Sequence, residues 1–196
     1  AQGLKAAIAQ VKNVEKFSDK ILKPLENGTA KTKSEFSKNL IILDGNLSPS
    51  ILSKIAKNKN FMNYDVRIVS ASPAKAIRLQ PFLNLSNTTI YCNKNEAEIL
   101  CKLVFKNTKE ASSHLLKKGL GRAIVTDGAN PICDSTINQK PILILPPKVK
   151  YIRHVSGAGD YFLACHIANE INQLKKENAL AQAAKSAAKY VETEIK

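Results

Sequence analysis

The sequence has few of the residues that build metal centres or disulfide scaffolds. It contains only four cysteines, Cys92, Cys101, Cys133 and Cys165, and no two of them have the C-x-x-C spacing of consecutive zinc ligands. The three histidines do not cluster with the cysteines. Disulfide scaffolds are shorter and richer in cysteine, so we expect reduced thiols in the core of a cytosolic protein.

Long apolar runs and linkers are also missing. No run approaches the roughly 18 residues that span a bilayer, and no basic segment precedes an apolar segment and a cleavage site. No repeat or linker rich in proline, glycine or serine divides the chain. With 44% apolar and 23% charged residues, the 196-residue chain is neither disordered, collagen-like nor a coiled coil as a whole. We therefore expect one domain over 1–196, without a membrane segment and in the cytoplasm.

Arginine is scarce in a basic chain. There are 30 Lys and Arg residues against 16 Asp and Glu, a formal net charge of +14, but only Arg67, Arg78, Arg122 and Arg153 are arginine. Arginine is the residue most used for bidentate recognition of phosphate and guanine. The lysines are scattered and form no block of about five like charges. This favours a lysine bias on a solvated surface; the alternative is a basic face for nucleic acid or an anionic ligand.

Short β-branched segments alternate with segments of helical period. Four segments are predicted as strands: 40–43, 66–69, 89–92 and 122–126. Helices are expected to begin after residues that cap helices, namely Ser48, Ser72, Asn93 and Asn107, the first two followed by proline. Apolar strands joined by helices predict an α/β protein with a mainly parallel sheet.

After Thr126 the pattern changes. Residues 131–133 and 141–145 are apolar and are separated by a polar stretch, which predicts an antiparallel, hairpin-like addition to the sheet. Two helices, over about 158–174 and 178–194, are expected to finish the chain, the second rich in alanine. Segment 15–38 suits two short surface helices, and we place no chemistry there.

One segment carries the strongest chemical signal, Ser156-Gly157-Ala158-Gly159-Asp160 before an apolar helix. In parallel α/β sheets, ligands bind outside the carboxyl ends of the strands, where helix N-termini expose unpaired amides. The glycines let several N–H groups turn toward one anion, and the aspartate can accept the proton of an attacking hydroxyl. The structural alternative is that Asp160 caps the helix after a glycine turn.

Three further segments place polar groups where predicted strands end. Asn93 and Glu96 open a helix directly after a strand, which suits cations and phosphates, or simple helix capping. The segment 125–130 leaves another strand with a hydroxyl and a glycine that can approach a phosphate, or forms a tight turn. Asp44-Gly45-Asn46 follows a third strand and adds a polar pair on the same edge.

With these motifs in this order, the chain resembles the ribokinase-like, or phosphofructokinase-B, family of small-molecule kinases from about Ala6 to Val191. Asn93 to Glu96 matches the N-x-x-E motif of the family. Segment 125–129 matches the nucleotide-binding strand end, 155–163 the G-A-G-D signature, and 179–192 the alanine-rich terminal helix. Segments 43–49, 69–79 and 93–100 look most like pseudouridine kinases; the neighbouring interpretation is a general nucleoside or sugar kinase.

The resemblance implies a three-layer α/β sandwich with a mainly parallel central sheet and ATP-dependent phosphoryl transfer to a hydroxyl of a sugar or nucleoside, a pseudouridine-like acceptor being favoured. Asp160 would be the catalytic base, with an anion hole formed by the amides of Gly157, Ala158 and Gly159. ATP would be bound by Asn93, Thr126, Gly128, Ala129 and Ser156. Glu96 and Asn93 would help to bind Mg²⁺, through water.

Two departures from the family pattern qualify this picture. His154 stands where many members have an acidic or amide residue that helps to form a monovalent-cation site. Because a histidine carries no permanent negative charge, we expect potassium activation to be weak or absent. The family's first strands, its glycine-rich substrate motif and most of its lid do not precede segment 6–9, which looks like the last strand from the lid to the core.

We therefore expect the ATP-binding portion of such a kinase, truncated at the N-terminus. Its partners would be a small sugar or nucleoside and either a separately encoded N-terminal half or a second copy of the chain. Two alternatives remain: a catalytically silent remnant that binds nucleotide, and a basic module that binds nucleic acid, which we regard as the minor one.

Overall fold

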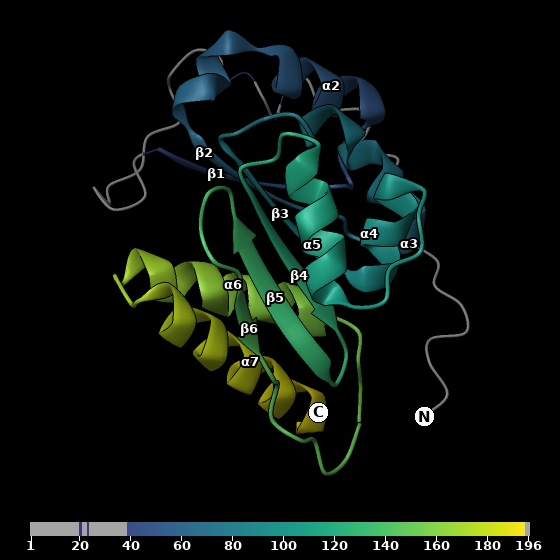
Figure 1. Cartoon of the computed structure of the whole chain (residues 1–196), viewed down its shortest axis with the longest axis vertical. Helices are drawn as coiled ribbons and strands as arrows, with labels where there is room; N and C mark the ends of the chain where they lie inside the picture. The colour runs from purple at the N-terminus through teal and green to yellow at the C-terminus, as the bar shows by residue number, and fades with distance from the viewer. Residues whose placement is uncertain (1–19, 21–22, 24–38, 195–196) are drawn as a thin grey trace. The chain divides into compact units, whose positions relative to one another are not determined.

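The computed structural model describes residues 20, 23 and 39–194 of the chain (Figure 1). Two compact units meet at residues 145 and 146, and each is described by itself below. The strand expected over 6–9 lies outside the described residues, and so do the surface helices expected over 15–38, apart from Lys20 and Lys23. The single domain over 1–196 stays a prediction.

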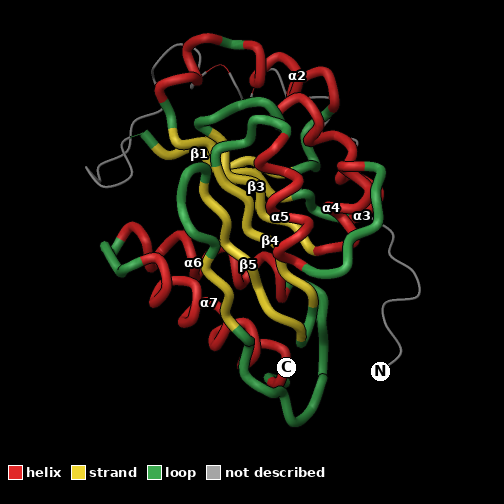
Figure 2. Tube along the Cα trace, viewed as in Figure 1, coloured by secondary structure: helices red, strands yellow, loops and turns green. Residues whose placement is uncertain are grey.

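The first unit is built on one sheet, whose strands lie side by side in chain order among the described residues (Figure 2). Its strands are β1 (Leu40–Asp44), β2 (Asp65–Val69), β3 (Thr88–Asn93), β4 (Arg122–Asp127), β5 (Asn130–Thr136) and β6 (Ile142–Ile144). The first four are parallel, whereas β5 and β6 are each antiparallel to the preceding strand. The predicted α/β class, mainly parallel sheet and antiparallel addition are confirmed.

The helices of this unit connect strands that are neighbours in the sheet. They are α2 (Pro49–Lys57), α3 (Pro73–Ala76), α4 (Lys94–Cys101) and α5 (Thr108–Lys117), with 3₁₀ turns η2 (Lys59–Asn63) and η3 (Ile77–Phe82). Because parallel crossovers are right-handed, strands paired in chain order place their connecting helices on the same face. The buried core accordingly contains strand residues such as Ile68 of β2 and Ile90 of β3. It also contains Leu52 of α2 and Leu100 of α4.

Helix starts follow local capping chemistry. Ser48 Oγ accepts from Ile51 N at 3.3 Å, and Asn107 Oδ1 accepts from Glu110 N at 2.9 Å, as predicted. Ser72, by contrast, makes no side-chain cap bond, and its helix has only four residues before it tightens into η3. Pro81 explains this, since proline lacks an N–H and collides with the carbonyl four residues earlier, which prevents a continuous α-helix.

A carboxylate at the end of α4 fixes the connection to α5. Glu98 Oε1 accepts from the backbone N–H of Phe105 at 3.1 Å and from Lys94 Nζ at 3.1 Å. These two hydrogen bonds, the backbone one first, lower the pKa of Glu98 from its ordinary value of 4.5. The loop after α4 is therefore tied back to the helix that it leaves.

Two arginines are buried in the sheet as structural ion pairs. Arg67 donates from Nη2 to Asp65 Oδ2 at 2.8 Å. Arg122 makes a bidentate pair with Asp134 on the neighbouring strand, Nε to Oδ1 at 2.8 Å and Nη2 to Oδ2 at 2.5 Å. Asp134 is only 2% exposed. Arg67 Nη1 also donates to Tyr91 Oη of β3 at 3.4 Å, so both arginines link neighbouring strands of the sheet.

The second unit consists of the segment from Pro146 and two helices, α6 (Ala158–Ile171) and α7 (Lys176–Glu192), which pack against each other. The helices begin and end close to the predicted bounds. Ala179, Ala183 and Ala184 are buried. Their small side chains let the two packed helices approach closely. No helix among the described residues is long and apolar enough to cross a membrane.

Candidate active site

Polar side chains end the parallel strands of the first unit at one edge of the sheet. Asp44 ends β1, Ser70 follows β2, Asn93 ends β3, and Thr126 lies near the end of β4. Asn93 and Thr126 are direct neighbours in the register of β3 and β4. The structure thus brings together two of the predicted ATP-binding residues at the edge where α/β proteins bind ligands.

Asn93 and Glu96 form a complete capping box. Asn93 Oδ1 accepts from Glu96 N at 2.9 Å, and Glu96 Oε2 accepts from Asn93 N at 2.8 Å. Asn93 and Glu96 therefore do cap the helix, which was one of the two roles considered for them. Glu96 is only 7% exposed. The box uses one carboxylate oxygen of Glu96 and leaves the other without a hydrogen bond to the described residues.

Thr126, Gly128 and Ala129 lie where β4 turns into β5. The antiparallel register of β4 and β5 shifts between Val125 and Asp127, so Thr126 has no regular partner on β5, although it is paired with Asn93 on β3. Gly128 has φ +56° and no atom within 4 Å of the position that a Cβ would take. Asn130 Nδ2 donates to Asp127 Oδ2 at 3.0 Å and closes the turn. Gly128 and Ala129 are exposed at its tip.

A lysine outside the predicted site residues joins the same edge. Lys75 Nζ donates to Asn46 Oδ1 at 2.5 Å, and Asn46 Nδ2 donates to Asp44 Oδ2 at 2.8 Å. Ser70 Oγ is buried and has no hydrogen-bond partner among the described residues. The polar residues that follow two consecutive strands indicate this cluster in the sequence. The hydrogen bond from Lys75 to Asn46 joins residues 29 apart, so it can be found only from the folded structure.

The glycine segment of the second unit forms a tight turn into α6. Gly157 is the N-cap, in the left-handed region at φ +82° and ψ −7°. Ala158 N donates to Val155 O at 3.2 Å, so this amide, predicted to belong to the anion hole, is already used within the turn. The N–H groups of Gly157, Gly159 and Asp160 make no hydrogen bond with the described residues. Ser156 is exposed beside them.

Asp160 lies at the third position of α6 and is exposed. No side chain caps this helix. Among the described residues, Asp160 therefore does not act as a cap. Its carboxylate faces solvent at the positive end of a 14-residue helix. That position suits an acceptor of a proton from a bound hydroxyl.

His154, the residue for which we expected weak or absent potassium activation, packs against an aromatic ring of the second unit. Its ring meets Tyr190 edge-on, with ring centroids 4.5 Å apart. Its Nε2 is buried and has no hydrogen-bond partner among the described residues. The side chain therefore serves as a packing group beside the glycine turn.

The four cysteines are all free, and three of them are buried. Burial raises the pKa of the Cys92 thiol well above its ordinary value, with smaller effects of Glu96 and Cys101 in the same direction. Burial also raises the pKa of Cys101. Cys92, Cys101 and Cys133 are thus free thiols in the core, as predicted, whereas Cys165 is only partly buried.

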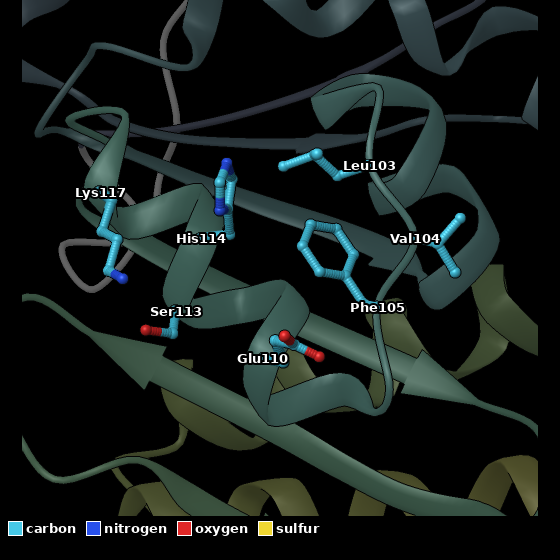
Figure 3. A pocket seen from close by; sticks show the side chains of 7 residues that line it. All are labelled: Leu103, Val104, Phe105, Glu110, Ser113, His114 and Lys117. Atoms are coloured by element: carbon cyan, nitrogen blue, oxygen red, sulfur yellow. The ribbon is translucent and has the colours of Figure 1, made fainter.

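A separate pocket of about 280 Å³ lies beside the loop between α4 and α5 (Figure 3). It is lined by Leu103, Val104, Phe105, Glu110, Ser113, His114 and Lys117. The rings of Phe105 and His114 lie beside each other there, with centroids 5.5 Å apart and planes tilted by 49°. None of the predicted site residues lines this pocket, so it plays no part in the candidate site.

Comparisons with known proteins agree with the motif order. None of the curated proteins matches the sequence. A carbohydrate kinase from Agrobacterium tumefaciens has a similar structure, with a TM-score of 0.71 and 23% identity over 94% of this chain and 57% of that one. Arabidopsis thaliana ribokinase, complexed with ribose and ATP, has a TM-score of 0.65 and 18% identity over 84% of this chain and 55% of its own.

An adenosine kinase from Schistosoma mansoni, in complex with 2-fluoroadenosine, gives a TM-score of 0.65 and 20% identity over 81% of this chain and 52% of that one. At these identities the structures establish a shared ribokinase-like fold, and the chain spans a little more than half of the length of each. The model of the pfkB family of carbohydrate kinases matches residues 8–194. The chain therefore belongs to the pfkB carbohydrate kinase family.

Proposed function

We propose that the chain carries the phosphoryl-transfer machinery of a kinase that acts on a hydroxyl of a sugar or nucleoside. The observation that carries this proposal is the exposed Asp160 in the first turn of α6, a helix without a side-chain cap, three residues after the left-handed Gly157 and beside unpaired amides. A base and an anion-binding turn in one segment are what transfer of a phosphoryl group to a hydroxyl requires.

Asp160 accepts the proton of the acceptor hydroxyl as its oxygen attacks. The amides of Gly157 and Gly159 donate to oxygens on which negative charge develops, and Ala158 supports the turn through its bond to Val155. ATP would supply the γ-phosphoryl group, whose bond to the β-phosphate oxygen breaks as the bond to the acceptor oxygen forms, so that ADP leaves. Bound Mg²⁺ would neutralise charge on the phosphates. Thr126, Gly128 and Ala129, with the exposed Ser156, border the nucleotide in this proposal.

The described residues fit a magnesium ion that is shared with phosphates. Glu96 keeps one carboxylate oxygen outside its capping box, whereas Asn93 Oδ1 already accepts from Glu96 N, so that the Asn93 NH2 group next to Thr126 would serve as a donor to a phosphate oxygen. No group of three or more His, Cys, Asp or Glu residues that could hold a metal occurs in the described part of the chain. Magnesium at nucleotide sites is held by one or two carboxylates together with phosphates and water, so few protein ligands suffice.

The favoured acceptor is pseudouridine, with other nucleosides and sugars as the neighbouring candidates. The support is the resemblance of segments 43–49, 69–79 and 93–100, which contain Asn46 and Lys75, to pseudouridine kinases. Hydrogen bonding between these two side chains places a cation at the edge of the sheet, where it can attract a phosphate. The remainder of the acceptor site would come from a separate N-terminal half or from a second copy of the chain.

The test is ATP binding followed by transfer. Calorimetric titration with ATP and Mg²⁺ is combined with a radiolabel transfer assay that offers pseudouridine, adenosine and ribose. Asp160→Asn should lower the transfer rate by about 10²- to 10⁴-fold and leave ATP binding nearly unchanged. Glu177→Gln is the matched control, because Glu177 is an exposed acid in the first turn of α7.

Three outcomes decide between the functions. Transfer that Asp160→Asn abolishes and Glu177→Gln preserves supports the proposal, and the preferred acceptor names the substrate class. Binding of ATP without transfer, alone or with a supplied N-terminal half, favours the silent remnant. Ordinary turnover by Asp160→Asn removes Asp160 from the mechanism.

A further inference from the structure

The end of α7 holds the segment that leads into the glycine turn. Arg153 N and His154 N both donate to Val191 O, at 3.0 and 3.4 Å. Lys150 N donates to Glu192 Oε1 at 2.6 Å. Residues 150–156 are thereby fixed along the last turn of a helix that lies more than 30 residues further along the chain.

Tyr190 extends this attachment to the turn itself. Its Oη donates to Ser156 O at 3.2 Å. Its ring stacks on Tyr161 of α6, with centroids 4.9 Å apart and an interplanar angle of 18°, and receives the edge of the His154 ring. Tyr190 is thus held from two sides while it binds a backbone carbonyl.

The carbonyl of Ser156 and the N–H of Gly157 belong to one peptide unit. All described peptide bonds are trans, so the two groups point in opposite directions. A hydrogen bond that holds the Ser156 carbonyl toward Tyr190 therefore turns the Gly157 N–H away from Tyr190. This N–H is one of the amides that make no hydrogen bond with the described residues.

The backbone at Gly157 is fitted to the same tyrosine. A Cβ on Gly157 would lie 2.7 Å from Tyr190 Oη, closer than Cβ atoms approach other heavy atoms. Gly157 O accepts from Tyr161 N at 2.8 Å, and Ala158 N donates to Val155 O at 3.2 Å, which close the turn on its other sides. Tyr190 thus occupies the volume that the missing side chain leaves.

We propose that Tyr190 is a positioning residue that presets the peptide between Ser156 and Gly157, so that the Gly157 amide is aimed before an anion arrives. The inference rests on the proposed function for its effect on rate. Aiming a donor in advance avoids reorganisation when charge develops on the transferring group, so loss of Tyr190 should act on kcat more than on the KM for ATP.

The experiment compares Tyr190→Phe, which removes only the hydroxyl, with Tyr190→Leu, which also removes the ring, in the full chain. Tyr151→Phe is the control, because Tyr151 is 70% exposed in the same unit. Amide exchange of Ala158 and Tyr161 is followed by NMR without any ligand, and kcat and KM for ATP are measured separately.

Loss of one hydrogen bond should speed exchange at these two amides by about fivefold in Tyr190→Phe and lower kcat by a similar factor, with KM for ATP within about twofold of its normal value. Tyr190→Leu should exceed both effects, and Tyr151→Phe should show neither. If wild-type protein transfers phosphate but both Tyr190 variants exchange and turn over as wild type does, the inference about Tyr190 is wrong. If wild-type protein shows no transfer, the proposed function fails, and the exchange rates alone decide whether Tyr190 presets the turn.

Discussion

Replacement of Gly157 by alanine should destabilise the protein far more than the same change two residues later. At φ +82° an L-residue costs about 1 to 2 kcal/mol relative to glycine. The new Cβ would also lie 2.7 Å from Tyr190 Oη, so the tyrosine must move and lose its hydrogen bond to Ser156. That loss adds about 1 kcal/mol, which brings the total to about 2 to 3 kcal/mol.

Gly159 is the matched control for this prediction. It lies in the first turn of α6 without a positive φ, and no atom lies within 4 Å of its missing Cβ. Gly159→Ala should therefore be neutral or stabilise the protein by up to about 1 kcal/mol. Activity is not compared for this variant, because its methyl group would face the ligand.

The assay is urea unfolding followed by far-ultraviolet circular dichroism. In the double variant Gly157→Ala, Tyr190→Phe the methyl group no longer meets a hydroxyl, so the combined loss should be smaller than the sum of the single losses by about 0.5 to 1 kcal/mol. If Gly157→Ala and Gly159→Ala have the same stability within about 0.5 kcal/mol, the close contact between Tyr190 and the turn does not exist in solution.

Three further predictions concern the first unit. Asp134→Ala removes the carboxylate, 1% exposed, that pairs with Arg122 and should cost about 3 to 5 kcal/mol in urea unfolding, whereas Asp65→Ala, which removes a carboxylate that is 45% exposed, should cost less than about 1 kcal/mol. Equal losses would contradict the burial argument. Because the folded pKa of Glu98 is lowered, its stabilising effect is complete above its ordinary pKa of 4.5 and disappears as the pH falls through the folded value. The difference in Tm between wild type and Glu98→Gln should therefore be largest near neutral pH and shrink as the pH falls from 4.5 through the lowered folded pKa; a difference that grows with acid would refute this. Finally, Cys92→Ala should not change the number of thiols that a disulfide reagent labels rapidly in the folded protein, because burial raises the pKa of the Cys92 thiol. In urea, the same variant should show one labelled thiol fewer than wild type. Loss of a rapidly labelled thiol in the folded protein would place Cys92 at the surface.

Most of the first unit could be predicted because its signals are local. Ser48, Asn93 and Asn107 each accept a hydrogen bond from the amide three residues further along, so the sequence around each residue predicts the helix start. Ser72 shows the limit of such a signal. It has the same sequence context as Ser48, but Pro81 downstream shortens the helix, and the capping bond is absent.

The candidate site was predicted only in part, because its local and its long-range contacts carry different information. Asp160 and the glycines are found from five consecutive residues. The attachment of Ser156 to Tyr190 joins residues 34 apart, and the link from Lys75 to Asn46 joins residues 29 apart. No periodicity or motif brings such pairs together, since only the packing of helices and strands decides which surfaces meet. The use of the Ala158 amide inside the turn is a local contact, since its partner Val155 lies three residues earlier, but it depends on the backbone conformation of the turn and not on a residue type.

The arginines bear on the meaning of the +14 charge. Arg67 and Arg122 are buried in ion pairs, Arg78 donates to the carbonyls of Gly45 and Leu47, and Arg153 is paired with Glu194. All four are thus engaged within the fold, so contact with an external polyanion would fall to lysines, which bind phosphate as point charges without bidentate geometry. We therefore expect any affinity for DNA to lack sequence preference and to fall steeply with salt. In a filter-binding assay at about 50 and 200 mM salt, equal affinities at both concentrations would contradict this argument, because binding by scattered lysines releases one counterion for nearly every phosphate that they neutralise.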